Sequence, residues 1–268
     1  MRLSGKVAVV TGTSPNIGGG IAEGLAAAGA KVGCLDVDPG NVEDCAAAIR
    51  EAGGEAIGIR CDVRSLEQVE EAVARVRREL GRLDVLVNNA AIFNQKGLLD
   101  MSLEEWANQT GVILTGAFLC SKVFARHLVE QGEGGAIVNI VSTAGHQGQP
   151  GNVAYCTAKS GLLNFTRSVA MELASHRIRV NSLTPTATDP RDAMARAERW
   201  GRPETDPRIL DFFEGFRRGV PMQELPDPTD YARAVVFLAS DDARHVTGAD
   251  LCVDAGALAR YWAWNPSG

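Results

Sequence analysis

Three side chains in the second half of the chain have the types and spacing suited to acid–base chemistry at an oxygen atom. Tyr155 and Lys159 are four residues apart in a stretch with helical periodicity, so their side chains share one helix face. A phenol has a reference pKa of about 10, but a neighbouring ammonium and a positively charged cofactor ring would favour its anion and bring the pKa toward neutrality, where proton exchange is most effective. Ser142 ends an apolar strand, and its hydroxyl either holds a substrate oxygen or caps the following loop.

A glycine-rich loop near the N-terminus has the context of a nucleotide-binding turn. The segment Thr11–Gly18 joins an apolar strand to a helix, and backbone N–H groups at such a helix start can hold a pyrophosphate. The candidate contacts are Gly12, Ser14, Asn16, Ile17 and Gly18. A tight turn before a packed helix would use the same glycines, so the loop alone leaves both interpretations open.

A carboxylate stands at the position expected for ribose recognition. Asp36 ends the second predicted strand, near the roughly 20-residue offset at which an acidic residue meets the adenosine hydroxyls. Its charge would accept from a free 2′-hydroxyl and repel a 2′-phosphate, and neither the loop nor Val37 supplies a cation. The sequence therefore predicts NAD rather than NADP, with a solvated strand-end aspartate as the alternative.

Short apolar runs alternate with helical patterns, which predicts parallel strands joined by crossover helices. Predicted strands are Lys6–Thr11, Ala30–Asp36, Ala56–Cys61, Leu83–Asn88, Ala136–Ser142, Arg179–Leu183 and Asp250–Val253. Predicted helices are Ile17–Gly29, Val42–Ala52, Leu66–Leu80, Leu103–Gln131, Ala154–Ser175 and Tyr231–Ala239. We expect one α/β domain over residues 1–268, a Rossmann-like doubly wound parallel sheet with helices on both faces.

Two segments depart from this alternation. Residues 190–228 break into charged and aromatic pieces divided by prolines, and long insertions in compact domains are often lids. We interpret them as a mobile substrate cover, with a surface excursion of no function as the alternative. The tail at 260–268 contains Tyr261, Trp262 and Trp264, so we expect it to pack on a neighbouring surface or a second subunit.

Composition and charge argue against several classes of protein. A chain that is 45% hydrophobic and 22% charged has an ordinary globular composition, and a net charge of -6 argues against a general nucleic-acid surface. We find no leader pattern and no apolar run of about 18 residues, which predicts a cytoplasmic protein without a membrane partner. The six cysteines lack zinc spacing, so we expect them to be reduced, mostly buried and not part of a metal site.

The order and spacing of several motifs resemble the short-chain dehydrogenase/reductase family over nearly the whole chain. The matching pieces are Thr11–Gly18, Cys61–Val63, Asn88–Ala91, Ser142, Tyr155–Lys159, Arg179–Ser182, Thr247–Gly248 and Val253–Asp254. The resemblance implies an NAD-dependent oxidoreductase that moves a hydride between nicotinamide and a secondary alcohol or ketone. In such an enzyme Ser142 holds the substrate oxygen, Tyr155 exchanges the proton, and Lys159 lowers the Tyr155 pKa and binds the nicotinamide ribose.

The resemblance also implies further cofactor contacts and an assembly. Asp62 and Val63 would border the adenine, Asn88 and Ala90 would line the cofactor cleft, and Pro185 would begin the segment beside the nicotinamide. Relatives are commonly tetramers, which predicts a homo-oligomer whose other partner is a small-molecule alcohol or ketone.

The sequence leaves the substrate open. The pocket is expected to be shaped by the cover and by Ala144, Gly145, His146 and Asn152, a mixture that suits sugars, acyl ketones, steroids or cyclic alcohols. His146 either touches substrate or lies exposed in its loop.

Three features depart from the family pattern. Asn16 replaces a loop glycine, and asparagine is the next residue most willing to adopt a positive φ. Thr186 and Pro190 replace the usual Gly and Thr, which affects the contact to the nicotinamide amide. Ile113 stands where the family has a catalytic Asn, which leaves a catalytically impaired NAD-binding sensor or scaffold as the alternative function. Gly111 and the β-branched residues after it are poor helix formers, so we expect the helix to loosen there.

Overall fold

The computed structural model describes residues 1–202, 206 and 208–261. Its strands form a parallel seven-stranded sheet in the order β3-β2-β1-β4-β5-β6-β7. The strands are β1 (Val7–Thr11), β2 (Lys31–Asp36), β3 (Ala56–Arg60), β4 (Val85–Asn88), β5 (Gly135–Ile140), β6 (Ile178–Pro185) and β7 (Asp250–Val253). The chain runs outward from β1 to β3 and then returns to place β4 beside β1. At such a reversal, doubly wound folds bind ligands beyond the carboxyl ends of the strands.

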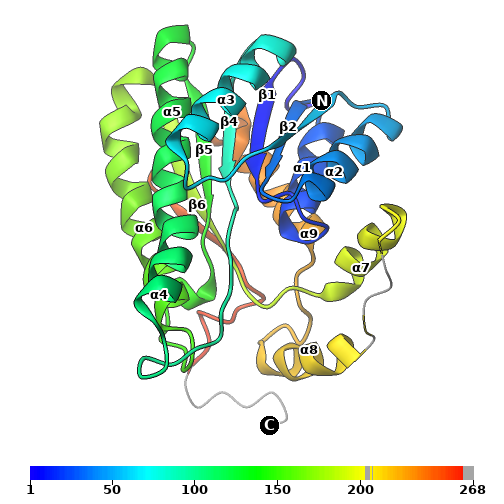
Figure 1. Cartoon of the computed structure of the whole chain (residues 1–268), viewed down its shortest axis with the longest axis vertical. Helices are drawn as coiled ribbons and strands as arrows, with labels where there is room; N and C mark the ends of the chain where they lie inside the picture. The colour runs from blue at the N-terminus through cyan, green and yellow to red at the C-terminus, as the bar shows by residue number, and fades with distance from the viewer. Residues whose placement is uncertain (203–205, 207, 262–268) are drawn as a thin grey trace.

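Helices cover both faces of the sheet (Figure 1). One face carries α1 (Ile17–Ala27), α2 (Pro39–Glu51) and α9 (Pro228–Ala239). The other carries α3 (Leu66–Leu80), α5 (Gly116–Gln131) and α6 (Val153–Leu173). The predicted fold class is confirmed.

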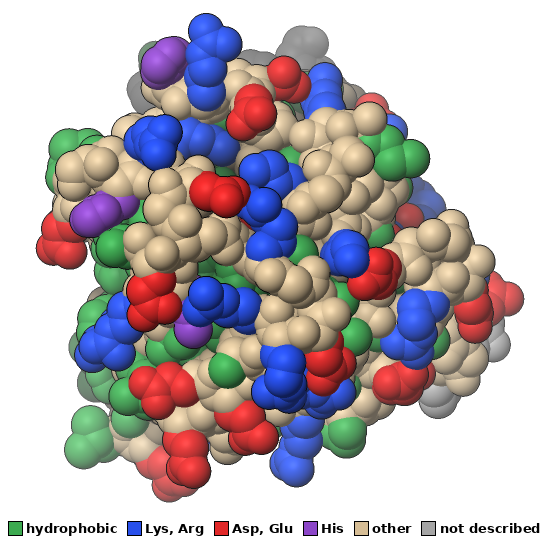
Figure 2. Space-filling model, turned by 90° about the horizontal axis from the view of Figure 1, so that it is seen from above, with side chains coloured by type: hydrophobic (Ala, Val, Ile, Leu, Met, Phe, Trp, Pro, Cys, Tyr) green, Lys and Arg blue, Asp and Glu red, His purple; other side chains and the backbone are tan. Residues whose placement is uncertain are grey.

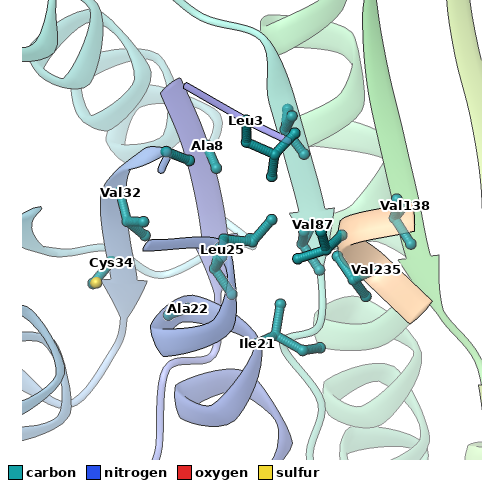
Figure 3. Close-up of a cluster of buried hydrophobic side chains, with 14 of the residues drawn as sticks. Leu3, Ala8, Ile21, Ala22, Leu25, Val32, Cys34, Val87, Val138 and Val235 are labelled. Atoms are coloured by element: carbon teal, nitrogen blue, oxygen red, sulfur yellow. The ribbon is translucent and has the colours of Figure 1, made fainter. Parts of the chain in front are cut away.

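The alternation of side chains along β1 explains why both faces are covered. Ala8 and Val10 belong to the core that also contains Leu25 of α1 and Val235 of α9 (Figure 3). Val7 and Val9 point the other way, into the core beneath α3 and α5. Because successive side chains of a strand face opposite sides, a strand buried on both sides is a continuous apolar run.

The predicted helix Leu103–Gln131 is continuous but changes its winding. It consists of α4 (Leu103–Thr110), a π-helical turn at Gly111–Thr115, and α5. The expected loosening at Gly111 is confirmed as a wider turn, a feature common at functional sites. By length and composition alone, this 29-residue helix is long and apolar enough to cross a membrane, a feature that the sequence argument passed over. Half of its most apolar window is nevertheless buried inside the protein, as in a core helix.

Two helices account for much of the segment at 190–228. They are α7 (Pro190–Arg199) and α8 (Arg208–Gly219), and Figure 1 places both beyond the carboxyl ends of the strands. Buried Arg196 anchors α7, because its guanidinium lies 3.0 Å from Glu23 of α1 and donates to the carbonyl of Pro15 at 3.1 Å. The tail beyond Tyr261 lies outside the described residues, so its packing stays a prediction.

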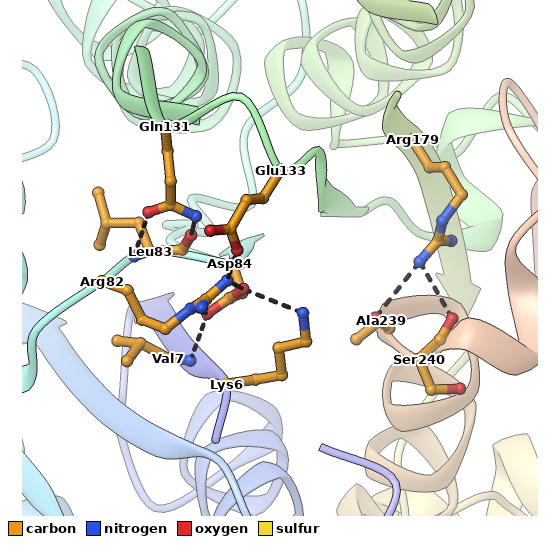
Figure 4. Close-up of polar contacts among 10 residues, drawn as sticks. All are labelled: Lys6, Val7, Arg82, Leu83, Asp84, Gln131, Glu133, Arg179, Ala239 and Ser240. Atoms are coloured by element: carbon orange, nitrogen blue, oxygen red, sulfur yellow. Dashed lines mark hydrogen bonds and ion pairs between the residues drawn. The ribbon is translucent and has the colours of Figure 1, made fainter. Parts of the chain in front are cut away.

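The opposite edge of the sheet, where the strands begin, is held by ion pairs (Figure 4). Asp84 accepts a hydrogen bond from the Val7 backbone N–H at 2.9 Å and two from Arg82 at 2.7 Å each. Lys6 approaches the same carboxylate at 3.3 Å, and Arg82 reaches on to Glu133 at 2.6 Å. Figure 2 views the molecule from the top of Figure 1, and Lys and Arg side chains lie across the middle of this face.

Candidate active site

Ser142, Tyr155 and Lys159 come together at the carboxyl end of the sheet. Ser142 follows β5, while Tyr155 and Lys159 lie on α6. A hydrogen bond links the Tyr155 phenol to the Ser142 side chain, and Lys159 Nζ lies 5.6 Å from the centre of the Tyr155 ring. All three line one cleft of about 930 Å³. The structure therefore assembles the predicted group, while the roles of its members stay predictions.

Ser142 shows the capping alternative that the sequence left open, while its contact with a substrate oxygen stays a prediction. Its hydroxyl oxygen accepts a hydrogen bond from the Ala144 backbone N–H at 3.1 Å, so it does cap the loop. Its side chain also reaches Tyr155 in the cleft. Capping fixes the direction of the hydroxyl, which keeps it beside the phenol.

Burial governs the electrostatics of the Tyr155 and Lys159 pair. Lys159 is fully buried, and this desolvation lowers its pKa to about 7. Burial likewise raises the pKa of Tyr155, and the hydrogen bond with Ser142 offsets only part of that effect. The pKa of the phenol is therefore raised in the protein alone, and the tuning expected from the ammonium together with a positive nicotinamide stays a prediction. A buried ammonium is itself destabilised and supplies less positive charge at neutral pH.

Lys159 has donor capacity left over. Its Nζ donates to the carbonyl oxygen of Ile140 at 2.6 Å, which fixes the amine at the end of β5. An ammonium has three N–H donors, and within the described part of the chain this is the one hydrogen bond that Lys159 makes. The other two are available to hydroxyl groups that enter the cleft.

The nucleotide loop presents an uncapped helix start to the same cleft. Ser14, Asn16 and Ile17 line it, and α1 begins at Ile17 with no side-chain cap and no acidic residue in its first turn. Side chains do cap α2, α3, α4, α7 and α9. Free N–H groups and the positive end of the helix dipole suit an anionic group such as a pyrophosphate.

Two glycines of this loop are required by its shape. Gly12 has φ +74°, and a Cβ there would lie 2.8 Å from the Cα of Ala90. A Cβ on Gly18 would lie 1.9 Å from the carbonyl oxygen of Gly12. Asn16 has φ −88°, so the argument that asparagine is tolerated for its positive φ was wrong. An ordinary side chain is accommodated because this turn does not need a left-handed residue there.

Asn89, which the sequence argument passed over, supports the loop. Its side-chain amide donates to the carbonyl oxygens of Thr11 and Gly12 at 3.1 and 2.8 Å, and it lines the cleft. Asn88 instead donates to Ser121 and Asn139 in the buried interior at 2.9 and 2.8 Å. Asn89 and Ala91 line the cleft, whereas Asn88 and Ala90 do not, and the contacts of Asn88 and Ala90 with a cofactor stay predictions.

Asp36 lies at the end of β2, half-buried, and burial raises the pKa of its carboxyl. It accepts a hydrogen bond from the Asp38 backbone at 3.0 Å. Arg60 is the neighbour of Asp36 in the register of β2 and β3. Its Nε donates to the Val37 carbonyl at 3.1 Å. The sequence argument missed this cation because it stands on a neighbouring strand.

The two residues predicted to border the adenine have side-chain partners within the protein, and their contact with a cofactor stays a prediction. Asp62 is bound by the guanidinium of Arg64 at 2.6 Å, which lowers the pKa of the carboxyl. Val63 is buried, and its side chain lies so close to Gly116 that a Cβ there would be 2.6 Å away. Neither residue lines the cleft.

Apolar side chains form the outer wall of the cleft. Phe212, Phe213 and Phe216 of α8 pack on one another with ring centres 5.4 to 5.9 Å apart, and Met194 of α7 lies on the same wall. Phe93 meets the Tyr155 ring edge to face at 5.3 Å. The wall suits a substrate with an apolar body.

The polar lining contains few charges. Among the described residues, the charged side chains that line the cleft are Lys159 and Arg260, and no Asp or Glu is present. Asn152, Pro185 and Thr186 line it as well. Of the predicted pocket residues, Ala144, Gly145 and His146 do not. A Cβ on Gly145 would meet Val141 and Lys159, and the His146 ring lies against Thr184 of β6 and Asp250 of β7. The cleft thus favours neutral or anionic substrates.

Ile113 fills the position where a water-holding asparagine would stand. It is 1% exposed and packs with Ala117, Val141 and Leu162. The small void beside it has no room for a water molecule. Any proton path from Lys159 therefore does not pass through this part of the helix.

A family model described as enoyl-(acyl carrier protein) reductase matches residues 12–257. The chain belongs to the short-chain dehydrogenase/reductase family. It is 33% identical over 256 residues to 2,3-dihydro-2,3-dihydroxybenzoate dehydrogenase of Bacillus subtilis (strain 168), covering 95% of this chain and 97% of that one. It is 38% identical over 255 residues to cis-4-hydroxycyclohexanecarboxylate dehydrogenase of Sinomonas cyclohexanicum, with coverage of 95% and 97%.

Solved structures of the family match as closely. Carveol dehydrogenase from Mycobacterium avium, in complex with NAD, has a TM-score of 0.85 and 30% identity, covering 97% of this chain and 99% of that one. The resemblance found in the sequence is confirmed, and the protein is an oxidoreductase of a family that uses nicotinamide cofactors. Its own residues fit such a group, because the uncapped start of α1 and the free donors of Lys159 open into one cleft.

Proposed function

We propose that this protein is an NAD(H)-dependent dehydrogenase that interconverts a secondary alcohol and a ketone. The observation that carries the proposal is the grouping of Ser142, Tyr155 and Lys159 in the cleft onto which the uncapped start of α1 opens. The sensor or scaffold alternative is not favoured, because this acid–base group is complete and the named relatives are dehydrogenases.

In this proposal Tyr155 takes the hydroxyl proton of the alcohol and Ser142 donates a hydrogen bond to the same oxygen. The nicotinamide supplies a hydride acceptor for the carbinol carbon. Lys159, held by the Ile140 carbonyl, directs its free N–H donors at the ribose hydroxyls. Its positive charge is then stabilised by those oxygens, which raises its share of the charged form and favours the Tyr155 phenolate. Lys159 would hold the cofactor's ribose and would take part in passing the proton from Tyr155 toward solvent, since the void beside Ile113 has no room for a water molecule.

NAD is the proposed cofactor because Asp36 stands where it would accept from the 2′-hydroxyl of the adenosine ribose. Arg60 weakens this argument but does not remove it. Its Nε is held by the Val37 carbonyl, so the guanidinium is partly committed to the backbone.

The proposed substrate class is a hydroxylated apolar ring, neutral or carrying a carboxylate. The phenylalanine wall of α8 supports the apolar part, and Arg260 with the absence of acidic lining among the described residues supports an anionic one. Two of the named relatives, from Bacillus subtilis and Sinomonas cyclohexanicum, carry names of ring-containing hydroxy acids. In this proposal α7 and α8 cover the bound substrate.

A homo-oligomer with a cytoplasmic location remains part of the proposal. Exposed Phe118 on α5 and Met171 on α6, at 46% and 66%, give these helices apolar surface that a second copy would cover. Size-exclusion chromatography with light scattering tests the assembly directly.

The deciding experiment follows NADH absorbance with purified protein and a panel of alcohols. The panel holds cis-4-hydroxycyclohexanecarboxylate, cyclohexanol and a linear polyol, each with NAD and with NADP. We expect the ring substrates to exceed the polyol in kcat/KM, and NAD to exceed NADP. Turnover of the polyol alone would refute the substrate class, and no turnover of any secondary alcohol would refute the function.

A further inference from the structure

Three potential metal ligands meet outside the catalytic cleft, where β7 borders the loop that follows β5. They are His146 in that loop and Asp250 and Cys252 on β7, and their ligand atoms all lie within 4.8 Å of one another. His146 Nε2 is 3.1 Å from Asp250 Oδ2, and Cys252 Sγ is 3.5 Å from the same oxygen. The three side chains therefore converge on one point.

The spacing of these atoms suits a tetrahedral ion. Zinc binds nitrogen and oxygen at about 2.0–2.2 Å and sulfur at about 2.3 Å, which puts neighbouring ligand atoms roughly 3.3–3.6 Å apart. The distances of 3.1 and 3.5 Å lie close to those edges. The third pair, His146 and Cys252, lies within 4.8 Å, so the imidazole and the thiol would approach each other around the ion. A set of imidazole, carboxylate and thiolate favours Zn²⁺ over the oxygen-seeking Mg²⁺ and Ca²⁺.

The carboxylate is oriented as a ligating group would be. Ser182 donates to Asp250 Oδ1 at 2.6 Å, and Thr184 lies 3.0 Å from the same oxygen. Thr184 also donates to Oδ2 at 2.9 Å, so the two hydroxyls fix the carboxylate, whose Oδ2 lies beside His146 and Cys252. Outer-shell hydrogen bonds of this kind are what fix ligands in metal sites.

A plain hydrogen-bond network is the competing explanation. Burial, followed by the nearby carboxylates of Asp250 and Asp254, raises the pKa of Cys252 to about 12, so without a cation the thiol is a donor to Asp250. The imidazole of His146 also lies 3.2 Å from the Thr184 hydroxyl. The two explanations differ in whether a metal ion replaces the thiol proton, which is directly measurable.

We propose that His146, Asp250 and Cys252 bind Zn²⁺, with a water molecule as the fourth ligand. The ion ties the edge strand β7 to the loop that begins at Ser142, and so stabilises the end of the sheet that bears the active site. Sequence spacing could not predict this site, because His146 and Asp250 are 104 residues apart. Only the return of the chain to β7 brings them together.

Cobalt is the probe for the experiment, because a thiolate bound to Co²⁺ gives a charge-transfer absorption in the near ultraviolet. The full-length protein is stripped with a chelator, titrated with Co²⁺ and then with Zn²⁺. We expect one equivalent of Co²⁺ to produce the band, and Zn²⁺ to abolish it. Zn²⁺ should also raise the Tm of the stripped protein, since a ligand that binds the folded state stabilises it.

Matched variants separate the site from adventitious binding. C252S should lose the band, and H146Q should weaken Co²⁺ binding at least tenfold. The controls C156S and H176Q, each outside the cluster, should bind as the wild type does. No band, or a band that persists unchanged in C252S, would overturn the proposal. Should C252S fail to fold, unchanged Co²⁺ affinity in H146Q would overturn it equally. None of these readouts depends on dehydrogenase activity.

Discussion

The two ends of the strands in the sheet differ in how their polar groups are satisfied. Where the strands begin, Asp84 is saturated by Val7, Arg82 and Lys6, and the charges satisfy one another. Where the strands end, Lys159 is buried and makes one hydrogen bond within the described part of the chain, in which α1 also starts without a side-chain cap. The first arrangement stabilises the fold, and the second leaves polar groups available to a ligand. The same parallel sheet thus separates stability from function along the strand direction.

The largest effect should come from removing one hydroxyl at the carboxyl edge. Y155F should lower kcat by about 10²–10⁴-fold, the usual contribution of a general acid–base group, or about 2.7–5.5 kcal/mol. NADH affinity should stay within a few-fold and Tm should hardly change, because little packing volume is lost. Steady-state kinetics, a cofactor titration and thermal unfolding measure the three quantities. The companion variant K159A should damage both turnover and cofactor binding.

If Y155F keeps more than about a tenth of the wild-type activity, Tyr155 is not the acid–base group. The carboxyl edge would then lack the specialised role that the comparison assigns to it.

The raised pKa of Tyr155 predicts the pH dependence of the reaction. Oxidation of the alcohol needs the phenolate, so kcat/KM for oxidation should rise with pH by up to tenfold per unit below the operative pKa. Reduction of the ketone needs the phenol, so its kcat/KM should be constant below that pKa and fall above it. S142A removes a hydrogen bond that lowers this pKa, so its oxidation profile should shift toward higher pH. A profile that stays in place in S142A would contradict the assigned contact.

At the other edge the expected effect is on stability alone. D84A removes a carboxylate whose side chain is only 6% exposed and leaves the Val7 N–H and Arg82 without it. It should lower the free energy of unfolding by about 2–3 kcal/mol, measured by denaturant titration. The control E133A alters an exposed partner of Arg82 and should cost at most about 1 kcal/mol. A large loss of kcat in folded D84A would show that the two edges are not independent.

The cofactor preference should change by about tenfold. D36A should narrow the difference in binding affinity between NAD(H) and NADP(H), because it removes the carboxylate that would repel the 2′-phosphate. R60A, which removes the cation beside Val37, should widen it. Fluorescence titration of both cofactors into the wild type and each variant tests this. Equal or stronger NADP(H) binding by the wild type would mean that Asp36 does not contact the ribose.

The sequence predicted the sheet well because its signals are local. Continuous apolar strands, helical periodicity and the glycines of Thr11–Gly18 each depend on neighbours in the chain. It failed where partners come from distant strands, as with Arg60 beside Val37 and His146 beside Asp250. Motif spacing placed the loop containing Asn89 but could not say which side chain of the motif faces the cleft. The pKa of Lys159 was also beyond reach, because desolvation depends on the whole fold.

The smallest effect is expected at Ile113, where the chain departs from its family. The π-helical turn at Gly111–Thr115 already widens the helix there without an asparagine, and Ile113 is sealed in an apolar cluster with no room for water. I113N should therefore change kcat by less than about tenfold, or roughly 1.4 kcal/mol. It should cost about 1–3 kcal/mol of stability, because the amide would be buried without partners. I113V is the matched control and should cost about 0.5–1.5 kcal/mol of stability with kcat unchanged.

Both variants and the wild type should be assayed with NAD across one alcohol panel and pH range. If the wild type turns over nothing while I113N is active, the dehydrogenase proposal is wrong, and a cofactor-binding sensor takes its place. The carboxyl edge would then bind a cofactor without catalysing a reaction.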